Sequence, residues 1–113
     1  MGQERYRVFL SESAKQMLRK IGEKYGKKVY EILRDLIFAL EVEPEKKGQP
    51  LGGGLRGLYS LHYSRYRVIY KIQRDECVVL IVGAGWHESG SRADIYQVIE
   101  RMIESGEIRP DST

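Results

Sequence analysis

Three β-rich runs follow one another with almost no chain between them, and this spacing constrains the fold more than any other feature. The runs are Leu55–Tyr63, Tyr66–Gln73 and Cys77–Val82, and their connections lie at Ser64-Arg65 and Asp75-Glu76. Connections this short cannot carry the crossover that parallel neighbours need, so neighbouring strands must be antiparallel. The third run is apolar on both faces, as a central strand is. The sequence therefore predicts an antiparallel meander.

A short strand over residues 5–10 and two amphipathic helices are predicted before the meander. Ser11, followed by an acidic residue, is a good helix N-cap. The first helix is expected to end near Gly22 or Gly26, and Pro44 to stop the second, so the two form a hairpin. Apolar residues recur at helical spacing in both segments, at Ala14, Met17, Leu18 and Ile21 and then at Val29, Ile32, Leu33, Leu36, Ile37 and Leu40.

The rest of the chain is predicted to form loops and one more helix. Residues 44–54 are rich in Gly, Pro and Lys and predict a loop, as do residues 83–91. Residues 94–103 carry apolar side chains at helical spacing, and the tail 104–113 is polar. A chain of 113 residues suits one domain. The expectation is a single two-layer α+β domain over residues 1–113, with one sheet face partly open to solvent.

Composition excludes several classes of protein. No apolar run approaches the ~18 residues of a membrane span, and the first residues lack the apolar core of a signal peptide. A cytoplasmic protein without a membrane partner is therefore expected. Cys77 is the single cysteine, and its apolar surroundings predict a buried structural thiol. Two histidines and one cysteine at no ligand spacing predict neither a metal nor another cofactor.

Positive charge is concentrated in the second half of the chain, although the net charge is only +3. Alternation along the strand that begins near Arg65 places Arg65, Arg67 and Lys71 on one face, which should be the open one. Cations with nearby tyrosines favour binding of a nucleic acid, since the cations pair with phosphates and the rings stack on unpaired bases. The same pattern is also typical of an edge strand whose charges prevent aggregation. Residues 46–74 contain no acid and seven bases, namely Lys46, Lys47, Arg56, Arg65, Arg67, Lys71 and Arg74.

Several motifs together carry a resemblance to a known family. They are the turn Pro50-Leu51-Gly52 with the strand that follows it, Tyr66-Arg67-Val68-Ile69-Tyr70, then Val82-Gly83 and Asp94-Ile95-Tyr96. This order resembles the RelE/ParE superfamily of toxins from bacterial type II toxin–antitoxin pairs, and it covers nearly the whole chain. The resemblance implies a RelE-like fold, a cognate antitoxin as partner, and a toxin–antitoxin hetero-oligomer.

The RelE-like branch, which we favour, implies a ribosome-dependent endoribonuclease that cuts mRNA. Attack by the ribose 2′-hydroxyl on the adjacent phosphate needs no metal, only proton acceptors, proton donors and cations. The resemblance assigns Arg67 to transition-state charge and Tyr96 to proton transfer. Arg56 is a looser catalytic match, and Lys46 and Lys47 are expected to bind RNA.

The sequence departs from the RelE pattern after Val82-Gly83, where that branch has a basic residue. Either His87 replaces this residue as a general acid or base, or Arg92 reaches back to fill its place. A histidine titrates near pH 6.5, which suits acid–base catalysis, although His87 in a solvated loop would need no such role. Trp86 either stacks on a base or covers the end of the core. The remaining RNA-binding predictions are Arg65 and Lys71.

Two other functions remain open from the sequence. A ParE-like toxin would inhibit DNA gyrase and have no nuclease activity. An inactive RNA-binding module would bind RNA in a salt-sensitive way without cleaving it. The nuclease prediction is favoured because a gyrase inhibitor requires neither Tyr96 nor a histidine at position 87.

Overall fold

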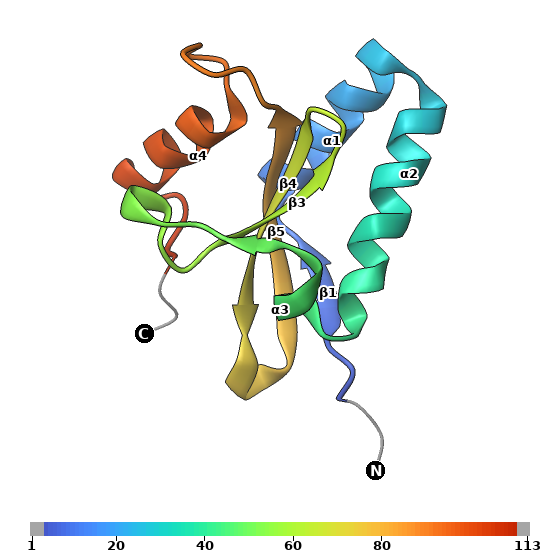
Figure 1. The fold of residues 1–113 in the computed structure, drawn as a ribbon, viewed down its shortest axis with the longest axis vertical. Helices are drawn as coiled ribbons and strands as arrows, with labels where there is room; N and C mark the ends of the chain where they lie inside the picture. The colour runs from blue at the N-terminus through green and yellow to red at the C-terminus, as the bar shows by residue number, and fades with distance from the viewer. Residues whose placement is uncertain (1–3, 111–113) are drawn as a thin grey trace.

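The computed structural model describes residues 4–110 and confirms the α+β class (Figure 1). A five-stranded sheet separates a pair of helices from a third long helix on its opposite side. The elements in chain order are β1 Arg7–Leu10, α1 Glu12–Tyr25, α2 Lys27–Phe38, η1 Ala39–Glu41, α3 Pro44–Lys47, β2 Gln49–Pro50, η2 Gly53–Leu55, β3 Tyr59–Tyr63, β4 Tyr66–Gln73, η3 Arg74–Glu76, β5 Val78–Trp86 and α4 Ile95–Glu104, where η marks a 3-10 helix.

The predicted meander is confirmed, and the sheet order is β1-β5-β4-β3-β2. β3, β4 and β5 pair antiparallel, and β1 joins the far edge of β5 as a parallel strand. The β3–β4 turn is tight because Tyr63 pairs directly with Tyr66. Ser64 has a φ of 55°, the positive value that such two-residue hairpin turns favour. This register fixes which side chains meet across the hairpin.

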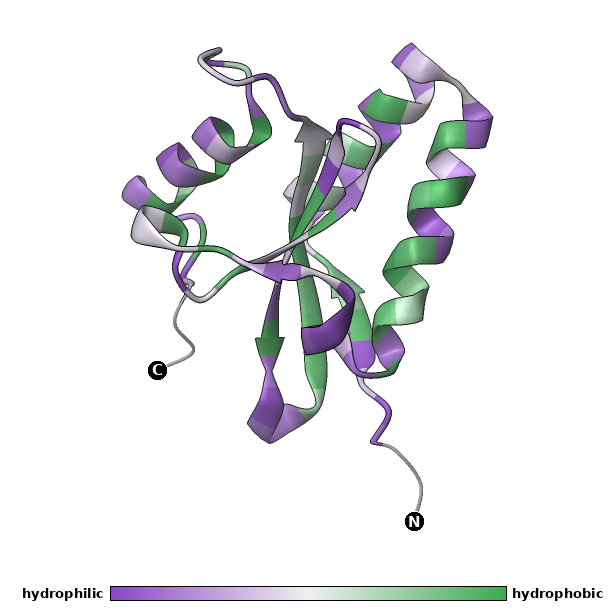
Figure 2. Ribbon diagram, viewed as in Figure 1, coloured by the Kyte–Doolittle hydropathy of each residue, from purple (hydrophilic) through white to green (hydrophobic). Residues whose placement is uncertain are grey.

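The two N-terminal helices follow the sequence prediction closely. The Ser11 hydroxyl accepts a hydrogen bond from the Ala14 amide at 3.0 Å and begins α1. Gly26 ends α1 with a φ of 108°, a value that costs glycine little. Apolar and polar residues alternate along both helices, as the colours of Figure 2 show, and the buried residues of both are apolar. A first core therefore lies between this hairpin and the sheet, around Leu18, Leu33 and Tyr70.

A β-bulge lies in β5 where the sheet packs against α4. Ile69 pairs with Gly83 while Tyr70 pairs with Ile81, so Val82 is an extra residue in β5. A second core forms on this face from residues of β4, β5 and α4, including Ile69, Val82 and Ile99. A Cβ at Gly83 would lie 2.5 Å from the Ile99 side chain, so glycine permits the close approach of α4.

The predicted partly open sheet face is open only at the tip of the β3–β4 hairpin, where His62 is exposed. α4 covers the face that carries Ile69, because its own apolar stripe needs burial. The tail is not uniformly polar either, since Ile108 is buried in the second core. Lys71 is buried, and its ammonium donates to the Arg109 carbonyl at 2.9 Å. Alternation places Lys71 on this face as expected, but not in contact with solvent.

Three local predictions also differ from the structure. Residues 44–54 contain the short elements α3, β2 and part of η2, because Pro44 begins a helical turn and Pro50 pairs with Tyr59. β5 continues to Trp86, past the predicted end at Val82, since its glycines pair with β4. Cys77 is only partly buried, because it lies at the turn before β5 and outside the strand.

Gly48 provides a test of the packing below α3. A Cβ there would lie 2.8 Å from the Ser60 carbonyl oxygen, although the φ of −123° suits any residue. We expect Gly48→Ala to lower the free energy of unfolding by about 1–3 kcal/mol, because the backbone of β3 must shift. Gly52→Ala is the control, since nothing lies within 4 Å of its Cβ position. Urea unfolding of both variants measures the difference, and equal stabilities would contradict this account.

Candidate functional site

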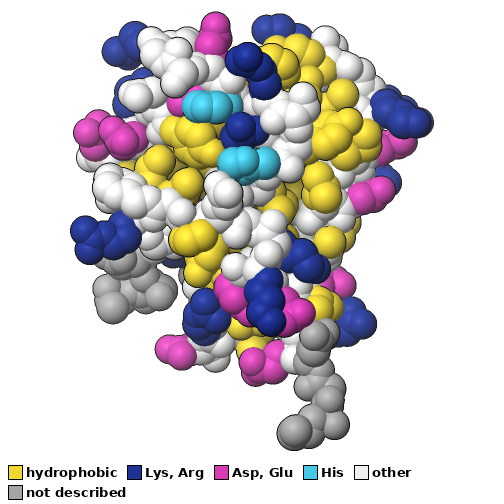
Figure 3. All heavy atoms as spheres, viewed as in Figure 1, with side chains coloured by type: hydrophobic (Ala, Val, Ile, Leu, Met, Phe, Trp, Pro, Cys, Tyr) yellow, Lys and Arg dark blue, Asp and Glu magenta, His cyan; other side chains and the backbone are white. Residues whose placement is uncertain are grey.

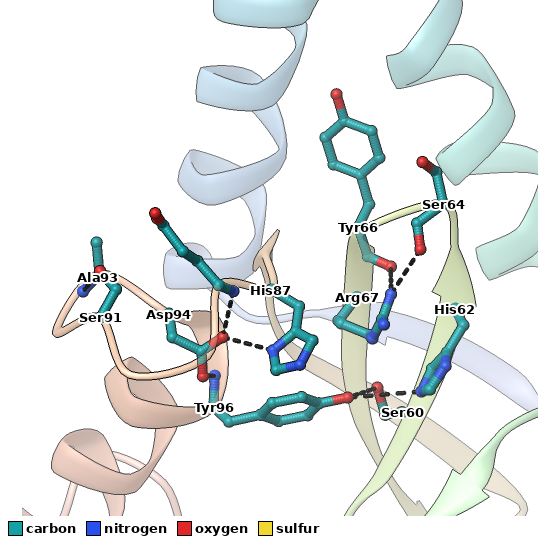
Figure 4. Close-up of polar contacts among 11 residues, drawn as sticks. Ser60, His62, Ser64, Tyr66, Arg67, His87, Ser91, Ala93, Asp94 and Tyr96 are labelled. Carbon is teal, nitrogen blue, oxygen red and sulfur yellow. Dashed lines mark hydrogen bonds and ion pairs between the residues drawn. The ribbon is translucent and has the colours of Figure 1, made fainter.

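Six polar side chains meet where the β3–β4 hairpin approaches the first turn of α4 (Figure 4). They come from β3, β4, the loop after β5 and α4, and we call them the polar cluster. Its members are Ser60, His62, Arg67, His87, Asp94 and Tyr96.

The Tyr96 hydroxyl is at the centre of the polar cluster. It lies 2.9 Å from the Ser60 hydroxyl oxygen and 3.5 Å from His62 Nε2. The His87 ring packs edge-on against the Tyr96 ring, with centroids 5.1 Å apart. Tyr96 thus contacts a histidine at its hydroxyl and another at its ring face. Such an arrangement can pass a proton between the hydroxyl and His62.

Asp94 holds the cluster in place. Its Oδ2 accepts a hydrogen bond from the Tyr96 amide at 3.1 Å and so caps α4. Its Oδ1 accepts from the Glu88 amide at 2.7 Å and lies 2.6 Å from His87 Nδ1. Burial alone would raise the pKa of Asp94, but hydrogen bonds from Glu88 and His87 outweigh it and lower the pKa below its ordinary value. The carboxylate is therefore charged at neutral pH.

Two backbone carbonyls hold the Arg67 guanidinium, and they use only one of its three nitrogens. Its Nη1 donates to the carbonyls of Ser64 and Tyr66, each at 2.9 Å. Among the buried side-chain nitrogen and oxygen atoms of residues 4–110, only Arg67 Nε lacks a hydrogen-bond partner. A buried donor without a partner is costly, so this side chain is held in place at the expense of one hydrogen bond.

His62 lies directly across the hairpin from Arg67. Burial, then the charge of Arg67, then His87, lower the pKa of His62 below 6.5. His62 is therefore neutral at pH 7 and can accept a proton. Figure 3 shows both histidines of the chain on one face, with a basic side chain between them. The polar cluster is thus open to a ligand from solvent.

The structure brings together three of the four predicted catalytic residues, Arg67, His87 and Tyr96. Arg65 adjoins them, because its carbonyl accepts the His87 amide at 2.7 Å. The fourth, Arg56, is exposed after η2, where neighbouring Gly54 lies against Glu100, one turn past Tyr96. No contact found within residues 4–110 joins the Arg56 side chain to the polar cluster.

The predicted RNA-binding residues are scattered. Lys46 pairs with Glu43 at 2.7 Å, and Lys47 donates to the Ala39 carbonyl at 2.7 Å. Both therefore lie on α3, beside the end of the α1–α2 hairpin. The prediction that Lys71 binds RNA does not fit the structure, because its buried ammonium already donates to a carbonyl. Arg92 is exposed on the loop before α4. Trp86 covers the first core and stacks on Tyr25.

Sequence reasoning missed Ser60, His62 and Asp94. A two-residue turn at Ser64-Arg65 pairs residue 62 with residue 67, so the hairpin register alone could have placed His62 beside Arg67. Asp94 stands before the first apolar residue of a helical repeat, the usual place of an N-cap. Nothing in the sequence marks Ser60, whose contact with Tyr96 depends on how α4 packs.

The described part of the chain offers no metal centre and no membrane helix. Residues 4–110 contain no group of three or more His, Cys, Asp or Glu side chains that could hold a metal ion. None of the helices in the same range is long and apolar enough to cross a membrane. The side chains of the polar cluster can themselves carry out acid–base catalysis and stabilise an anion.

Comparisons with known proteins point to one family. The family model described as the ParE toxin of type II toxin–antitoxin system, parDE, matches residues 8–88. The RelBE2 toxin–antitoxin complex of Mycobacterium tuberculosis has a similar chain, with 25% identity, a TM-score of 0.64, and coverage of 74% of this chain and 92% of that one. A search of curated proteins gave no significant match.

Two further solved structures share the fold. The archaeal RelE–RelB complex of Pyrococcus horikoshii is similar at 26% identity and a TM-score of 0.54, covering 72% of this chain and 93% of that one. The intact RelBE complex of Escherichia coli is similar at 22% identity and a TM-score of 0.59, covering 74% and 98%. The last likeness concerns the fold alone.

The electrostatic coupling of His62 to Arg67 can be measured directly. Replacing the guanidinium in Arg67→Gln removes a positive charge, so the pKa of His62 should rise. It should stay below 6.5, since burial, the largest cause, remains. An NMR titration of the His62 ring measures the change, with Arg74→Gln at the far end of β4 as control. A His62 pKa that is unchanged or lower in Arg67→Gln would contradict the coupling.

Proposed function

Because the chain belongs to the ParE-toxin family of type II toxin–antitoxin systems, we propose that this toxin is a ribosome-dependent endoribonuclease that cleaves mRNA. The observation that carries the proposal is that the Arg67 side chain, two histidines and the Tyr96 hydroxyl gather on one face. A phosphodiester bound there would lie beside a cation and place its reacting atoms among proton donors and acceptors.

The proposed reaction needs one proton acceptor and one donor. Asp94 accepts from His87 Nδ1, which leaves Nε2 free to take the proton of the RNA 2′-hydroxyl as this oxygen attacks the adjacent phosphorus. The bond to the 5′-oxygen then breaks, and Tyr96 gives that oxygen its proton. The products are a 2′,3′-cyclic phosphate and a 5′-hydroxyl end. Neutral His62 and Ser60 orient the Tyr96 hydroxyl. After the step, water takes the proton from His87 and returns one to Tyr96, which restores both groups.

Arg67 has the electrostatic role in this scheme. Extra negative charge develops on the phosphate oxygens as the 2′-oxygen attacks, and a fixed guanidinium stabilises it. One such donor contributes roughly 10²–10³-fold, and an acid–base group about 10²–10⁴-fold. These groups do not by themselves position the RNA for attack. If the ribosome positions it, cleavage depends on the ribosome. A cytoplasmic location, where ribosomes and mRNA meet, is part of the same proposal.

The partner that restrains this toxin is proposed to be an antitoxin that docks between α1 and α2. A groove of about 610 Å³ opens there, with an apolar floor that includes Leu18 and Ile37. Phe38, 50% exposed, stands at its side. Four cations and one acid line the groove, namely Lys15, Arg19, Lys27, Arg34 and Glu23. An acidic amphipathic segment of the antitoxin would match both the floor and the charge.

Inhibition of DNA gyrase is the second candidate function. The matched family model is the one described for ParE, and this observation favours a gyrase-directed toxin. Such a toxin would act by binding a protein and would not require the polar cluster. The two candidates differ in what happens to mRNA.

Primer extension on a defined mRNA tests the two functions. The purified toxin, freed of antitoxin and shown to be folded, is incubated with the mRNA alone and with ribosomes that carry it. Cuts in the decoding site that require ribosomes are expected. Intact mRNA in both reactions would overturn the nuclease proposal, and inhibition of gyrase supercoiling by the same protein would then support the second candidate.

Arg67→Ala is expected to lower ribosome-dependent cleavage at least about tenfold, because the transition-state charge loses its stabilising cation. Arg74→Ala is the matched control, since Arg74 is exposed at the opposite end of β4 and pairs with Glu45. Primer extension gives the cleavage rates, and circular dichroism checks the fold. Full activity of folded Arg67→Ala would remove Arg67 from the site.

Phe38→Asp tests the groove. An aspartate there removes an apolar contact and repels an acidic segment, so antitoxin affinity should fall about tenfold or more. Phe9→Asp is the control, because Phe9 is similarly exposed at 49% but does not line the groove. Isothermal titration with the cognate antitoxin measures both, and raising the salt should weaken wild-type binding. Equal affinities for the two variants would place the antitoxin elsewhere.

A further inference from the structure

Four aromatic side chains gather at the end of the sheet, on the face that carries α1. Trp86 of β5 stacks on Tyr25 at the end of α1, with ring centroids 5.5 Å apart and planes at 12°. Tyr66 of β4 meets both rings edge-on, at 5.4 Å from Tyr25 and 5.0 Å from Trp86. Tyr63 of β3 stacks on Tyr66 at 6.2 Å. We call these four residues the aromatic cluster.

Closing the end of the core does not explain why the aromatic cluster is exposed. Tyr66 is buried and belongs to the first core. Tyr63 and Trp86 are only partly buried, and Tyr25 is 39% exposed. Aromatic rings contribute most when they are desolvated, so an open ring beside others is a surface that a flat ligand can cover.

One cation lies against a ring of the aromatic cluster, and a second adjoins the cluster in the chain. Lys24 Nζ lies 5.3 Å from the centroid of the Tyr25 ring. Arg65 is exposed on the turn that joins Tyr63 to Tyr66. Rings beside cations complement a nucleotide, because the base stacks on the ring and the neighbouring phosphates pair with the charges. A purely apolar partner would leave both cations without a counter-charge.

The aromatic cluster adjoins the polar cluster through the backbone. Trp86 immediately precedes His87, and Tyr66 immediately precedes Arg67. Neighbouring side chains in a strand point to opposite faces, so Tyr66 lies on the α1 face and Arg67 on the α4 face. Figure 4 shows the Tyr66 ring directed away from the Arg67 guanidinium. A single strand that crosses the tip of the β3–β4 hairpin would therefore meet both clusters.

We infer, on the basis of the proposed RNA substrate, that the aromatic cluster binds an unpaired base of the strand whose phosphodiester occupies the polar cluster. Tyr25 and Trp86 provide the stacking surface, and Lys24 and Arg65 neutralise the flanking phosphates. Tyr25 thereby becomes a substrate-binding residue on α1, an element outside the polar cluster. Stacking tolerates any base, so this surface positions the strand and does not read its sequence.

Trp86 is the only tryptophan in the chain, so its fluorescence reports on this surface. The probe is a single-stranded RNA hexamer with 2′-O-methyl groups, which cannot undergo attack by its own 2′-oxygen. Titration of the hexamer is expected to quench Trp86. Tyr25→Ala should weaken binding roughly 5- to 100-fold, because one ring of the stack is lost. Tyr25→Phe keeps the ring and should bind within about twofold of wild type.

Two further variants separate stacking from other causes. Phe9→Ala removes another exposed aromatic ring, outside the aromatic cluster, and should leave hexamer binding unchanged. Lys24→Glu keeps every ring and should weaken binding and reduce its salt dependence, because one phosphate contact is lost. Thermal unfolding of each variant checks that the fold is intact.

The outcomes test the base-binding site formed by the aromatic cluster, called the base site, separately from the nuclease activity. No quenching by the hexamer, or equal binding by folded Tyr25→Ala and Phe9→Ala, would overturn the base site. Quenching by a protein that leaves mRNA intact on ribosomes would overturn the nuclease and keep the base site. Ribosome-dependent cleavage without quenching would keep the nuclease and overturn the base site.

Discussion

The buried carboxylate of Asp94 is the interaction on which the polar cluster depends. It is only 4% exposed, yet it serves the α4 N-terminus, the Glu88 amide and the His87 ring at once. A charged group in such a position is tolerated because three donors surround it. One side chain therefore contacts the helix start, the loop and the histidine, and Tyr96, whose amide donates to it, reaches Ser60 from the same helical turn.

Periodicity predicted most of the fold because it reports which residues share a face. It located α1, α2, the meander and α4, and the Ser11 cap and Gly26 fixed the ends of α1. It could not say which sheet face α4 covers, since burial of the same stripe is possible on either side. The bulge at Val82 also breaks strict alternation, so face assignments along β5 change at that point.

The site was predictable where chemistry and a family motif coincided, as for Arg67 and Tyr96. Counting charges was a poorer guide, because a count does not show where an ammonium finds its acceptor. Lys47 bonds the Ala39 carbonyl and Lys71 the Arg109 carbonyl, and neither position follows from composition. His62 shows the opposite case, since hairpin register fixed its neighbour although no motif named it.

The bulge in β5 also bears on how the length of this chain can vary. Val82 has no partner in β4, while Ile81 and Gly83 on either side of it are paired. A deletion of one residue at this point would keep every β4–β5 pair and remove one apolar side chain from the second core. Elsewhere in the strand, a deletion would turn all later side chains to the wrong face. β5 therefore contains a position at which this strand can lose one residue without realigning the loop that holds His87.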